Sequence, residues 1–334
     1  MTTAKAPDSN DPDGGLGAQQ SQADAQAQAD RQAPTDTKCG FVAVIGAPNA
    51  GKSTLVNLLV GTKVSIVSRK VQTTRTQIRG IAIEGAVQLV FVDTPGIFAP
   101  RRRLDRAMVE AAWSGTSEAD IIVLLVDAAK GRDDEVDAII AKLKDSPAPK
   151  FLALNKVDRL KNKAELLALS QSILADCEMD DVFMISALTG DGVSELRQAL
   201  AKRMPDSPWL YPADDVSDLP LRLLAAEITR EQIYDRLHQE LPYAITVETT
   251  SWEERRDRSV RIEQTIFVER ESQRSIVLGK GGQTIKAISS AARLAISEIV
   301  EVPVHLFLFV KVKENWSDDP ERYRELGLPF PDGA

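Results

Sequence analysis

The chain has 334 residues, with 41 lysines and arginines against 49 aspartates and glutamates, and a formal net charge of −8. This length allows two or three domains, and the acidic balance excludes a general polycation that coats nucleic acid by bulk attraction. The longest strictly aliphatic run, Ile121–Val126, is far shorter than the roughly 20 apolar residues of a membrane-spanning helix. An integral membrane protein is therefore excluded, but peripheral membrane contact is not. Two cysteines and two histidines provide neither a disulfide framework nor a zinc site, so we expect a protein of the reducing cytoplasm.

Residues 1–38 are predicted to be a disordered extension. They are rich in Ala, Gln, Asp and Gly, and one Leu is the only large aliphatic residue after Met1. Such a segment buries too little apolar surface to offset the entropy that it would lose on ordering. It has neither the apolar core of a signal peptide nor the arginine-rich composition of a transit peptide.

Between residues 39 and 205, short apolar runs alternate with amphipathic helical stretches. This alternation predicts an α/β domain with a mostly parallel sheet and helices on both faces. The predicted strands cover Phe41–Ile45, Val87–Val92, Ile121–Val126, Phe151–Leu154 and Val182–Ile185, and the predicted helices cover Lys52–Val60, Asp133–Lys144, Lys163–Cys177 and Val193–Met204.

Residues 206–220 combine prolines and aspartates with no cation, which predicts a semi-rigid acidic linker. A second domain, of α+β type, is predicted over residues 221–316 in the order helix, strand, strand, helix, Gly-rich loop, helix, strand. Its elements are Leu221–Gln239, Tyr243–Thr249, Val260–Val268, Ser275–Leu278, Gln283–Ile299 and Val302–Val312. The polar tail, residues 317–334, is expected to be loosely held or mobile.

The first candidate site is a Gly-rich loop between a predicted strand and a predicted helix. Gly46-Ala47-Pro48-Asn49-Ala50-Gly51-Lys52-Ser53, followed by Thr54, matches the motif G-x-x-x-x-G-K-[ST] in the context that it requires. Its glycines allow backbone N–H groups to surround phosphate oxygens, and the helix N-terminus adds a positive dipole end. We expect Lys52 to reach the β- and γ-phosphates and the Ser53 hydroxyl to bind Mg²⁺. The alternative is a chance Gly/Ser-rich loop.

A second motif, Asp93-Thr94-Pro95-Gly96, follows an apolar strand. At the end of that strand, Asp93 would face the phosphate loop and hold Mg²⁺ through water, and the Gly96 N–H would sense the γ-phosphate. An aspartate at a strand end is more often a turn former, but its place after a phosphate loop favours the magnesium role.

A third motif, Asn155-Lys156-Val157-Asp158, indicates guanine. A carboxylate accepts two hydrogen bonds from guanine, at the ring N–H and the exocyclic amine, and adenine lacks this donor pair, so Asp158 selects GTP over ATP. The aliphatic stem of Lys156 would lie along the base. Ser186-Ala187-Leu188 follows the next strand and offers a backbone N–H to the guanine carbonyl, although such a segment is commonly only a loop.

These four motifs resemble those of the GTPase family that includes Ras and the translation factors. The resemblance covers residues 40–205 and implies a P-loop GTPase domain with a six-stranded sheet that hydrolyses GTP to GDP and phosphate. It also implies that Gln72-Thr73-Thr74-Arg75-Thr76 is the first switch, similar to the Thr-Thr-Arg switch of bacterial ribosome-assembly and tRNA-modification GTPases. Thr74 would then bind Mg²⁺ together with Ser53 and Asp93. A surface strand is the alternative for a pair of threonines.

One residue departs from the Ras pattern. Ras has a water-orienting Gln directly after its Asp-x-x-Gly, where this chain has Ile97, whose side chain cannot hydrogen-bond water. In similar GTPases with Pro-Asn in the phosphate loop, that Asn helps to hold K⁺, where a cation offsets developing charge. We therefore expect K⁺ to stimulate hydrolysis through Asn49, for which a local turn role is the alternative. The residues expected to act in hydrolysis are Lys52, Asn49, Thr74 and Gly96.

The second domain holds a candidate RNA site at Gly279-Lys280-Gly281-Gly282. A tight Gly-x-x-Gly turn lets a sugar–phosphate backbone approach closely. The window 270–293 has five cations against one anion, a local charge of +4 around the turn, which provides the focus that phosphate affinity needs. With the element order above, the domain resembles a KH domain of the second topology. The residues expected to bind RNA are Arg274, Gly279, Lys280, Gly281, Gly282 and Lys286.

The two halves together resemble the Era family of bacterial GTPases over residues 39–316, and the segments Leu241-Pro242-Tyr243 and Pro303-Val304-His305-Leu306 are also similar to that family. The resemblance implies a monomeric GTP-hydrolysing factor that binds the 3′ end of 16S rRNA and promotes its processing and 30S subunit maturation. It also implies a peripheral fraction on the inner membrane. GTP and Mg²⁺ would order the switches (about 68–77 and 94–106) and set the RNA-competent pose of the KH domain.

Two other functional classes stay open from the sequence. One is an RNA-binding chaperone in which the nucleotide site only stabilises the fold. The other is a membrane-associated or cell-cycle switch whose KH domain contacts protein.

Overall fold

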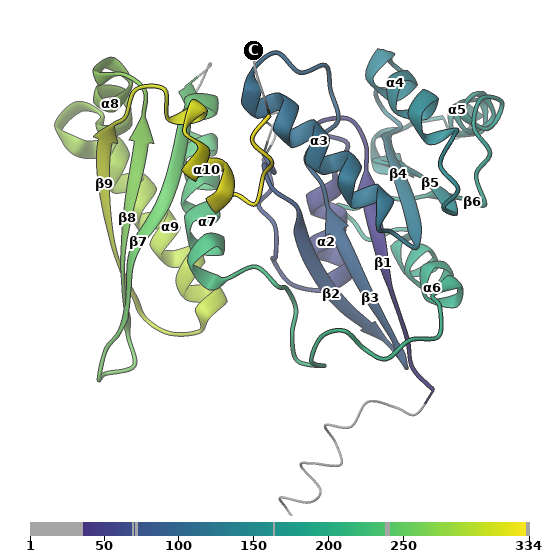
Figure 1. Ribbon diagram of the computed structural model, residues 1–334, viewed down its shortest axis with the longest axis horizontal. Helices are drawn as coiled ribbons and strands as arrows, with labels where there is room; N and C mark the ends of the chain where they lie inside the picture. The colour runs from purple at the N-terminus through teal and green to yellow at the C-terminus, as the bar shows by residue number, and fades with distance from the viewer. Residues whose placement is uncertain (1–35, 69, 71–72, 163, 238–240, 332–334) are drawn as a thin grey trace, which may run out of the picture.

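The apolar runs of the first half form a six-stranded sheet of order β2-β3-β1-β4-β5-β6 (Figure 1). The computed structural model describes residues 36–68, 70, 73–162, 164–237 and 241–331. Residues 1–35 of the extension predicted to be disordered (1–38) lie outside this part, but the prediction is wrong for Lys38, which begins β1. β2 is antiparallel to β3, and the other neighbours are parallel. The strands are β1 (Lys38–Ile45), β2 (Ile78–Glu84), β3 (Val87–Asp93), β4 (Ile121–Asp127), β5 (Lys150–Asn155) and β6 (Asp181–Met184).

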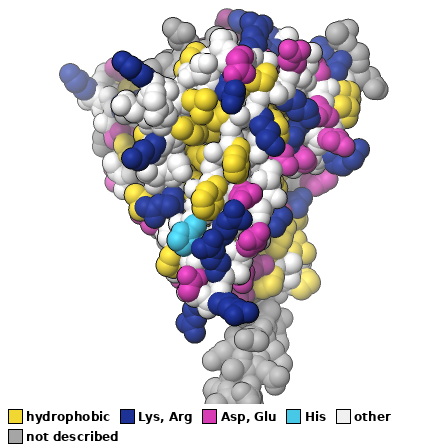
Figure 2. Space-filling model, turned by 90° about the vertical axis from the view of Figure 1, so that its left-hand side faces the viewer, with side chains coloured by type: hydrophobic (Ala, Val, Ile, Leu, Met, Phe, Trp, Pro, Cys, Tyr) yellow, Lys and Arg dark blue, Asp and Glu magenta, His cyan; other side chains and the backbone are white. Residues whose placement is uncertain are grey.

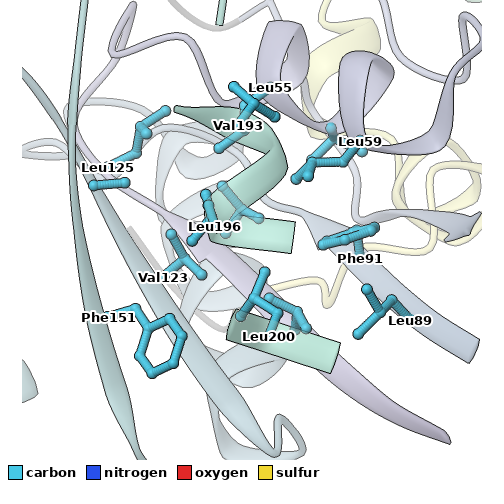
Figure 3. Close-up of a cluster of buried hydrophobic side chains, with 14 of the residues drawn as sticks. Leu55, Leu59, Leu89, Phe91, Val123, Leu125, Phe151, Val193, Leu196 and Leu200 are labelled. Carbon is cyan, nitrogen blue, oxygen red and sulfur yellow. The ribbon is translucent and has the colours of Figure 1, made fainter. Parts of the chain in front are cut away.

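Helices cover both faces of this sheet, as the sequence predicts. The helices are α2 (Lys52–Val60), α3 (Arg103–Ser117), α4 (Asp134–Leu143), α5 (Ala164–Leu174) and α6 (Val193–Arg203). α2 and α6 pack on one face, where Leu55, Leu196 and Phe91 belong to one buried cluster (Figure 3). α3, α4 and α5 contribute to a second cluster on the other face. Full burial of a leucine or phenylalanine side chain stabilises the fold by roughly 1.5–3 kcal/mol, so these two layers hold the strand ends that carry the motifs.

The second domain has a three-stranded sheet of order β7-β8-β9, in which β7 and β8 are antiparallel and β8 and β9 are parallel. Its elements are α7 (Leu221–Arg236), β7 (Ile245–Glu254), β8 (Val260–Val268), α8 (Glu271–Leu278), α9 (Gln283–Val300) and β9 (Val304–Val312). Apolar residues of α7 and α9 pack on one face of this sheet. The fold class is confirmed: an α/β P-loop domain is followed by an α+β domain with the predicted element order.

The segment between the domains follows the edge of the first sheet. Val216 accepts a backbone hydrogen bond from Ile81 of the edge strand β2 (2.9 Å), and the Ser217 hydroxyl donates to the Arg79 carbonyl (2.8 Å). The Gln88 side chain holds the same segment, because its Oε1 accepts from the backbone N–H of Leu210. This segment therefore occupies the hydrogen-bonding edge of β2 rather than crossing solvent, and it protects that edge from pairing with other chains.

The tail is packed against the first domain, so the prediction of a loosely held tail is wrong for residues 317–331. A short helix, α10 (Pro320–Glu325), lies between α7 and α3 (Figure 1). Trp316 and Tyr323 are each only 1% exposed and pack with apolar residues of α3. The polar and proline residues of this tail predict mobility, but its aromatic residues bury large apolar areas and hold it in place.

Candidate functional site

The loop between β1 and α2 has backbone positions that only glycine fits. A Cβ on Gly46 would lie 2.3 Å from the carbonyl oxygen of Leu125, and a Cβ on Gly51 would lie 2.4 Å from Asn155 Nδ2. Gly51 also has φ +103°, in the left-handed region that other residues rarely adopt. The loop is therefore pressed onto β4 and β5, and α2 begins directly after it with its N-terminus directed at the cleft.

Lys52 lies over the loop and is only 6% exposed. Its Nζ donates to the carbonyl oxygens of Gly46 and Ala47, at 3.0 Å each. Burial lowers the pKa of Lys52 to about 8, and the carboxylate of Asp93 opposes that shift. A buried ammonium that donates to two carbonyl oxygens is a ready partner for phosphate oxygens.

Oxygen atoms of four residues converge beside Lys52. Ser53 Oγ lies 2.8 Å from Thr74 Oγ1, which is 3.4 Å from Asp93 Oδ2, and the Ser65 hydroxyl donates to the same oxygen at 2.6 Å. Asp93 is fully buried, burial raises its pKa, and its Oδ1 has no hydrogen-bond partner among the described residues. An all-oxygen set with a buried, unsatisfied carboxylate oxygen fits Mg²⁺, which prefers oxygen ligands and keeps part of its water shell.

The segment after β3 lies against the phosphate loop. The Thr94 hydroxyl donates to the Val44 carbonyl at 2.8 Å, and the Ile97 N–H donates to the Gly46 carbonyl at 3.2 Å. A Cβ on Gly96 would lie 3.0 Å from Pro48, so only glycine fits there without displacing the loop. The side chain of Ile97 is buried and contributes no polar group to the site.

The base-side motifs form one hydrogen-bonded unit. Asn155 Nδ2 donates to the Ala50 carbonyl (2.7 Å), and its Oδ1 accepts from the Ala187 N–H (2.9 Å). Asp158 Oδ1 accepts from the Ser186 hydroxyl at 2.6 Å. Asn155 therefore joins the phosphate loop to the Ser186–Leu188 loop, and Ser186 orients the carboxylate that is expected to bind guanine.

The side chain of Lys156 connects the base-side motifs to the phosphate loop. Its φ is +66°, in the left-handed region, and its Nζ contacts both Asp127 Oδ2 (2.5 Å) and the Asn49 carbonyl (2.6 Å). These contacts fix the direction of the aliphatic stem across the mouth of the base site.

All these motifs surround one cleft of about 1010 Å³. Of the residues predicted to bind the nucleotide or a metal ion, those that line it are Pro48, Asn49, Gly51, Lys52, Ser53, Thr54, Thr74, Thr94, Gly96, Asn155, Lys156, Asp158, Ala187 and Leu188. The remaining predicted residues, Gly46, Ala47, Ala50, Asp93, Pro95 and Ser186, belong to the same loops but are not among the lining residues. Gln72, predicted as part of the first switch, lies outside the described residues.

The cleft has a wall that the sequence reading missed. Tyr234 and Asp235 of α7, in the second domain, are among its lining residues. Glu231, one turn earlier, accepts from Lys63 Nζ (2.5 Å) and from the Val67 N–H (2.8 Å). Arg230 donates to the Thr73 carbonyl. The expected first switch is thus bonded to α7, and no local signal in the sequence indicates these pairings, because the partners are more than 150 positions apart.

The Gly-rich turn of the second domain joins α8 to α9. Gly279, Gly281 and Gly282 have φ of 72°, 59° and 76°, which explains three glycines in four positions. A Cβ on Gly279 would meet Thr284 Oγ1 at 2.1 Å, whereas a Cβ on Gly281 would meet nothing within 4 Å. The Gly281 position is therefore open to a ligand that approaches closely.

Cations and exposed apolar side chains lie near this turn. Lys280 and Lys286 are exposed, and Arg274 pairs with Glu271 at 2.6 Å. Figure 2 faces this end of the molecule and shows a stripe of hydrophobic side chains with lysine and arginine on either side. Ile276 of α8 and Phe309 of β9 are 54% and 48% exposed. Apolar surface next to focused positive charge suits unstacked bases and their phosphates.

Two family models match the chain. A model described as 50S ribosome-binding GTPase matches residues 41–156, and a KH domain model matches residues 240–317.

Curated relatives match over nearly their whole length. The chain is 65% identical over 295 residues to GTPase Era of Afipia carboxidovorans, with 88% of this chain and 96% of the relative covered. It is 63% identical over 295 residues to GTPase Era of Rhizobium meliloti, with 88% and 94% covered. It is 62% identical over 297 residues to GTPase Era of Brucella suis biovar 1, with 89% and 95% covered.

Solved structures match over both domains of the chain. One is Era in complex with MgGDPNP and nucleotides 1506–1542 of 16S ribosomal RNA, with a TM-score of 0.83, 38% identity, and 87% of this chain and 99% of that chain covered. A variant of Aquifex aeolicus Era bound to GDP and AlF₄⁻ gives the same four values.

Proposed function

The chain belongs to the Era family of GTPases, and from this we propose that GTP binding sets its KH domain to bind the 3′ end of 16S ribosomal RNA. In this role the protein promotes 16S rRNA processing and maturation of the 30S subunit. The solved Era complex that this chain resembles contains MgGDPNP and nucleotides 1506–1542 of 16S ribosomal RNA, which supports both ligand classes for this chain.

One observation carries the control step of this proposal: the nucleotide cleft is lined by both domains. Thr74, whose hydroxyl belongs to the oxygen cluster, directly follows Thr73, whose carbonyl accepts from Arg230 of α7. A nucleotide that positions Thr74 therefore also positions the point where α7 is held. A ligand shifts an equilibrium by its differential affinity for the two states, and this arrangement provides such a difference.

The chain's own residues would bind and orient GTP as follows. Backbone N–H groups of the loop from Gly46 to Gly51 surround the phosphates, and Lys52 donates to the β- and γ-phosphate oxygens. Asp158 accepts from guanine, and Asn155 keeps the two loops in register. Bound Mg²⁺, held by Ser53 and Thr74 and by Asp93 through water, would neutralise charge on the phosphate oxygens.

A second cation is proposed for the loop. Asn49 is exposed, lines the cleft, has φ +62°, and its side chain makes no hydrogen bond to another described residue. It is therefore available to hold K⁺ near the phosphates, where a positive charge offsets the charge that develops in hydrolysis. Turnover measured in K⁺ and Na⁺ buffers of equal ionic strength tests this, with Asn49→Ala as the matched variant. Equal rates in the two buffers for the unmodified protein would contradict the role of K⁺.

The main experiment is multiple-turnover GTP hydrolysis with and without purified small subunits, in K⁺ buffer. We expect turnover, stimulation by the subunits, and loss of both in Lys52→Ala, since that change removes the buried ammonium at the phosphate loop. A nucleotide site that only stabilises the fold would give binding without turnover, and this result would contradict the proposed GTP cycle.

A monomeric cytoplasmic protein with a peripheral fraction at the inner membrane is proposed from the family resemblance alone. Within the described part of the chain, no helix is both long and apolar enough to cross a membrane. Analytical ultracentrifugation tests the monomer, and co-flotation with lipid vesicles tests the membrane contact.

A further inference from the structure

Trp316 lies where the two domains and the tail meet. It follows β9 and is 1% exposed, and its indole Nε1–H donates to the carbonyl of Ala244, directly before β7, at 3.0 Å. Its ring packs in the cluster that α3 contributes to, together with Tyr323 of α10. α3 begins at Arg103, a few residues after the Asp93–Gly96 motif. Trp316 therefore packs against the helix that begins in the expected second switch.

Arg75, from the first switch, reaches the same place. Its guanidinium carbon lies 5.6 Å from the centre of the Trp316 ring, and its side chain is 1% exposed. Nη1 donates to the carbonyl of Ile245 at 2.9 Å, and Nη2 donates to the carbonyl of Tyr243 (3.3 Å) and to the Tyr234 hydroxyl (3.4 Å). The buried Nε of Arg75 has no hydrogen-bond partner among the described residues.

Arg75 and Trp316 thus bind consecutive carbonyls, those of Ile245 and Ala244, at the start of β7. The two contacts depend on different switches: Arg75 follows the magnesium-ligand candidate Thr74, and Trp316 packs on α3. Charge-assisted hydrogen bonds from a planar guanidinium are directional, and a buried cation over an indole ring is stabilised only while the two stay in contact. A displacement of either switch breaks the arrangement at the same backbone position.

We propose that Arg75 and Trp316 form a single junction through which both nucleotide switches position the KH domain. This inference rests on the proposed control of RNA binding by GTP and names the residues that transmit it. Both act as positioning residues, because neither contacts the nucleotide cleft in the described chain. A junction of this kind makes RNA competence depend on both switches being closed together, rather than on either one.

The test compares the affinity of an oligonucleotide with the 16S rRNA 3′-end sequence in the GTP-analogue and GDP states, by fluorescence anisotropy. For the unmodified protein we expect a ratio of about tenfold, within the usual range of allosteric coupling. Arg75→Lys keeps the charge but loses the planar fork, and Trp316→Phe keeps apolar packing but loses the indole N–H. Each is expected to bring the ratio to about one to two, with nucleotide affinity within about twofold of the unmodified protein.

The double variant distinguishes one junction from two independent contacts. If Arg75 and Trp316 act as a unit, the double variant has the same ratio as either single variant, because the first change already breaks the coupling. The matched control is Trp113→Phe. Trp113 lies on α3 and, like Trp316, has a cation over its ring, Lys142 at 4.1 Å. It has no part in the junction, so the ratio should be unchanged.

The outcomes separate this inference from the function on which it rests. If the unmodified protein has equal RNA affinities in both states, the proposed control by GTP fails and the junction fails with it. If the unmodified protein shows the ratio and both variants keep it, the junction alone is overturned. Equal loss of RNA affinity in both states would indicate damage to the KH domain and would also overturn the junction. If Trp316→Phe does not fold, Arg75→Lys, which leaves the tryptophan in place, decides alone.

Discussion

Replacing Asn155 by alanine tests how the phosphate loop and the base site are held together. The Asn155 side chain is buried and makes two hydrogen bonds, to the Ala50 carbonyl at 2.7 Å and from the Ala187 N–H at 2.9 Å. Alanine would leave both backbone partners buried without a partner. Each such orphaned group costs about 1–3 kcal/mol, so the variant should lose about 2–6 kcal/mol of combined fold stability and nucleotide affinity.

This loss divides between two measurable quantities. Thermal unfolding of the nucleotide-free protein reports the part that affects stability. Isothermal titration with GDP reports the rest, and a loss of about 2 kcal/mol there is roughly a 30-fold weaker affinity. Asn155→Asp is the matched variant, because it keeps the acceptor for Ala187 but places an oxygen against the Ala50 carbonyl. Its expected loss is at least as large.

The reasoning would be refuted by an alanine variant whose unfolding temperature and GDP affinity both equal those of the unmodified protein. Such a result would mean that water replaces the side chain at both partners. The two buried loops would then be held by contacts other than Asn155.

Three further predictions follow from the structure. Burial lowers the pKa of Lys52 to about 8, and a bound phosphate favours the charged form of its side chain. Nucleotide binding near pH 8 should therefore take up about half a proton, and the affinity should weaken as pH rises. Titrations in buffers of different ionisation enthalpy measure this uptake, and its absence would contradict the prediction. Gly281→Asp should weaken RNA binding about tenfold, because a carboxylate repels phosphate. Gly281→Asn should weaken it much less, because asparagine has the same shape without the charge and also tolerates the φ of 59°. Equal effects of the two changes would argue against phosphate at this turn. Leu196→Ala, in the buried cluster of Figure 3, should cost about 2–5 kcal/mol of unfolding free energy, measured by urea unfolding, with GDP affinity in the folded protein unchanged.

The motifs of the nucleotide cleft could be predicted because each depends on a short stretch of chain. The loop from Gly46 to Lys52 has residue types that the backbone itself requires, as the close approaches of Gly46 and Gly51 show. The apolar run Ile121–Val126 is buried along its whole length, which is typical of a central parallel strand. At these positions, the local sequence pattern and the tertiary environment favour the same backbone structure.

Two elements of the first domain were not predicted from the pattern of residues. β2 has Gly80 in its middle, and a glycine weakens the signal of a strand; in the structure this glycine is required, because a Cβ would lie 2.7 Å from Val60. α3 ends in Ser114-Gly115-Thr116-Ser117, residues of low helix propensity. Packing of its apolar face against the sheet and the tail outweighs that propensity.

The wall of the cleft formed by the second domain could not be predicted from the sequence. Glu231 pairs with Lys63, and Arg75 bonds to the Ile245 carbonyl, 168 and 170 positions away. Neither periodicity nor a motif indicates pairings at such separations. Lys63, Arg75 and Glu231 resemble ordinary surface charges in the sequence, and only the docked arrangement of the domains makes Arg75 and Glu231 buried.

The most direct test of the central claim is a closed thermodynamic cycle of six affinities. Isothermal titration would give the affinity of the 16S rRNA 3′-end oligonucleotide for the GTP-analogue-bound and GDP-bound protein, and the affinity of each nucleotide for the protein with and without that RNA. The account predicts that the GTP analogue strengthens RNA binding and that RNA raises the preference for the GTP analogue over GDP by the same factor. Equal RNA affinities in the two nucleotide states would contradict it.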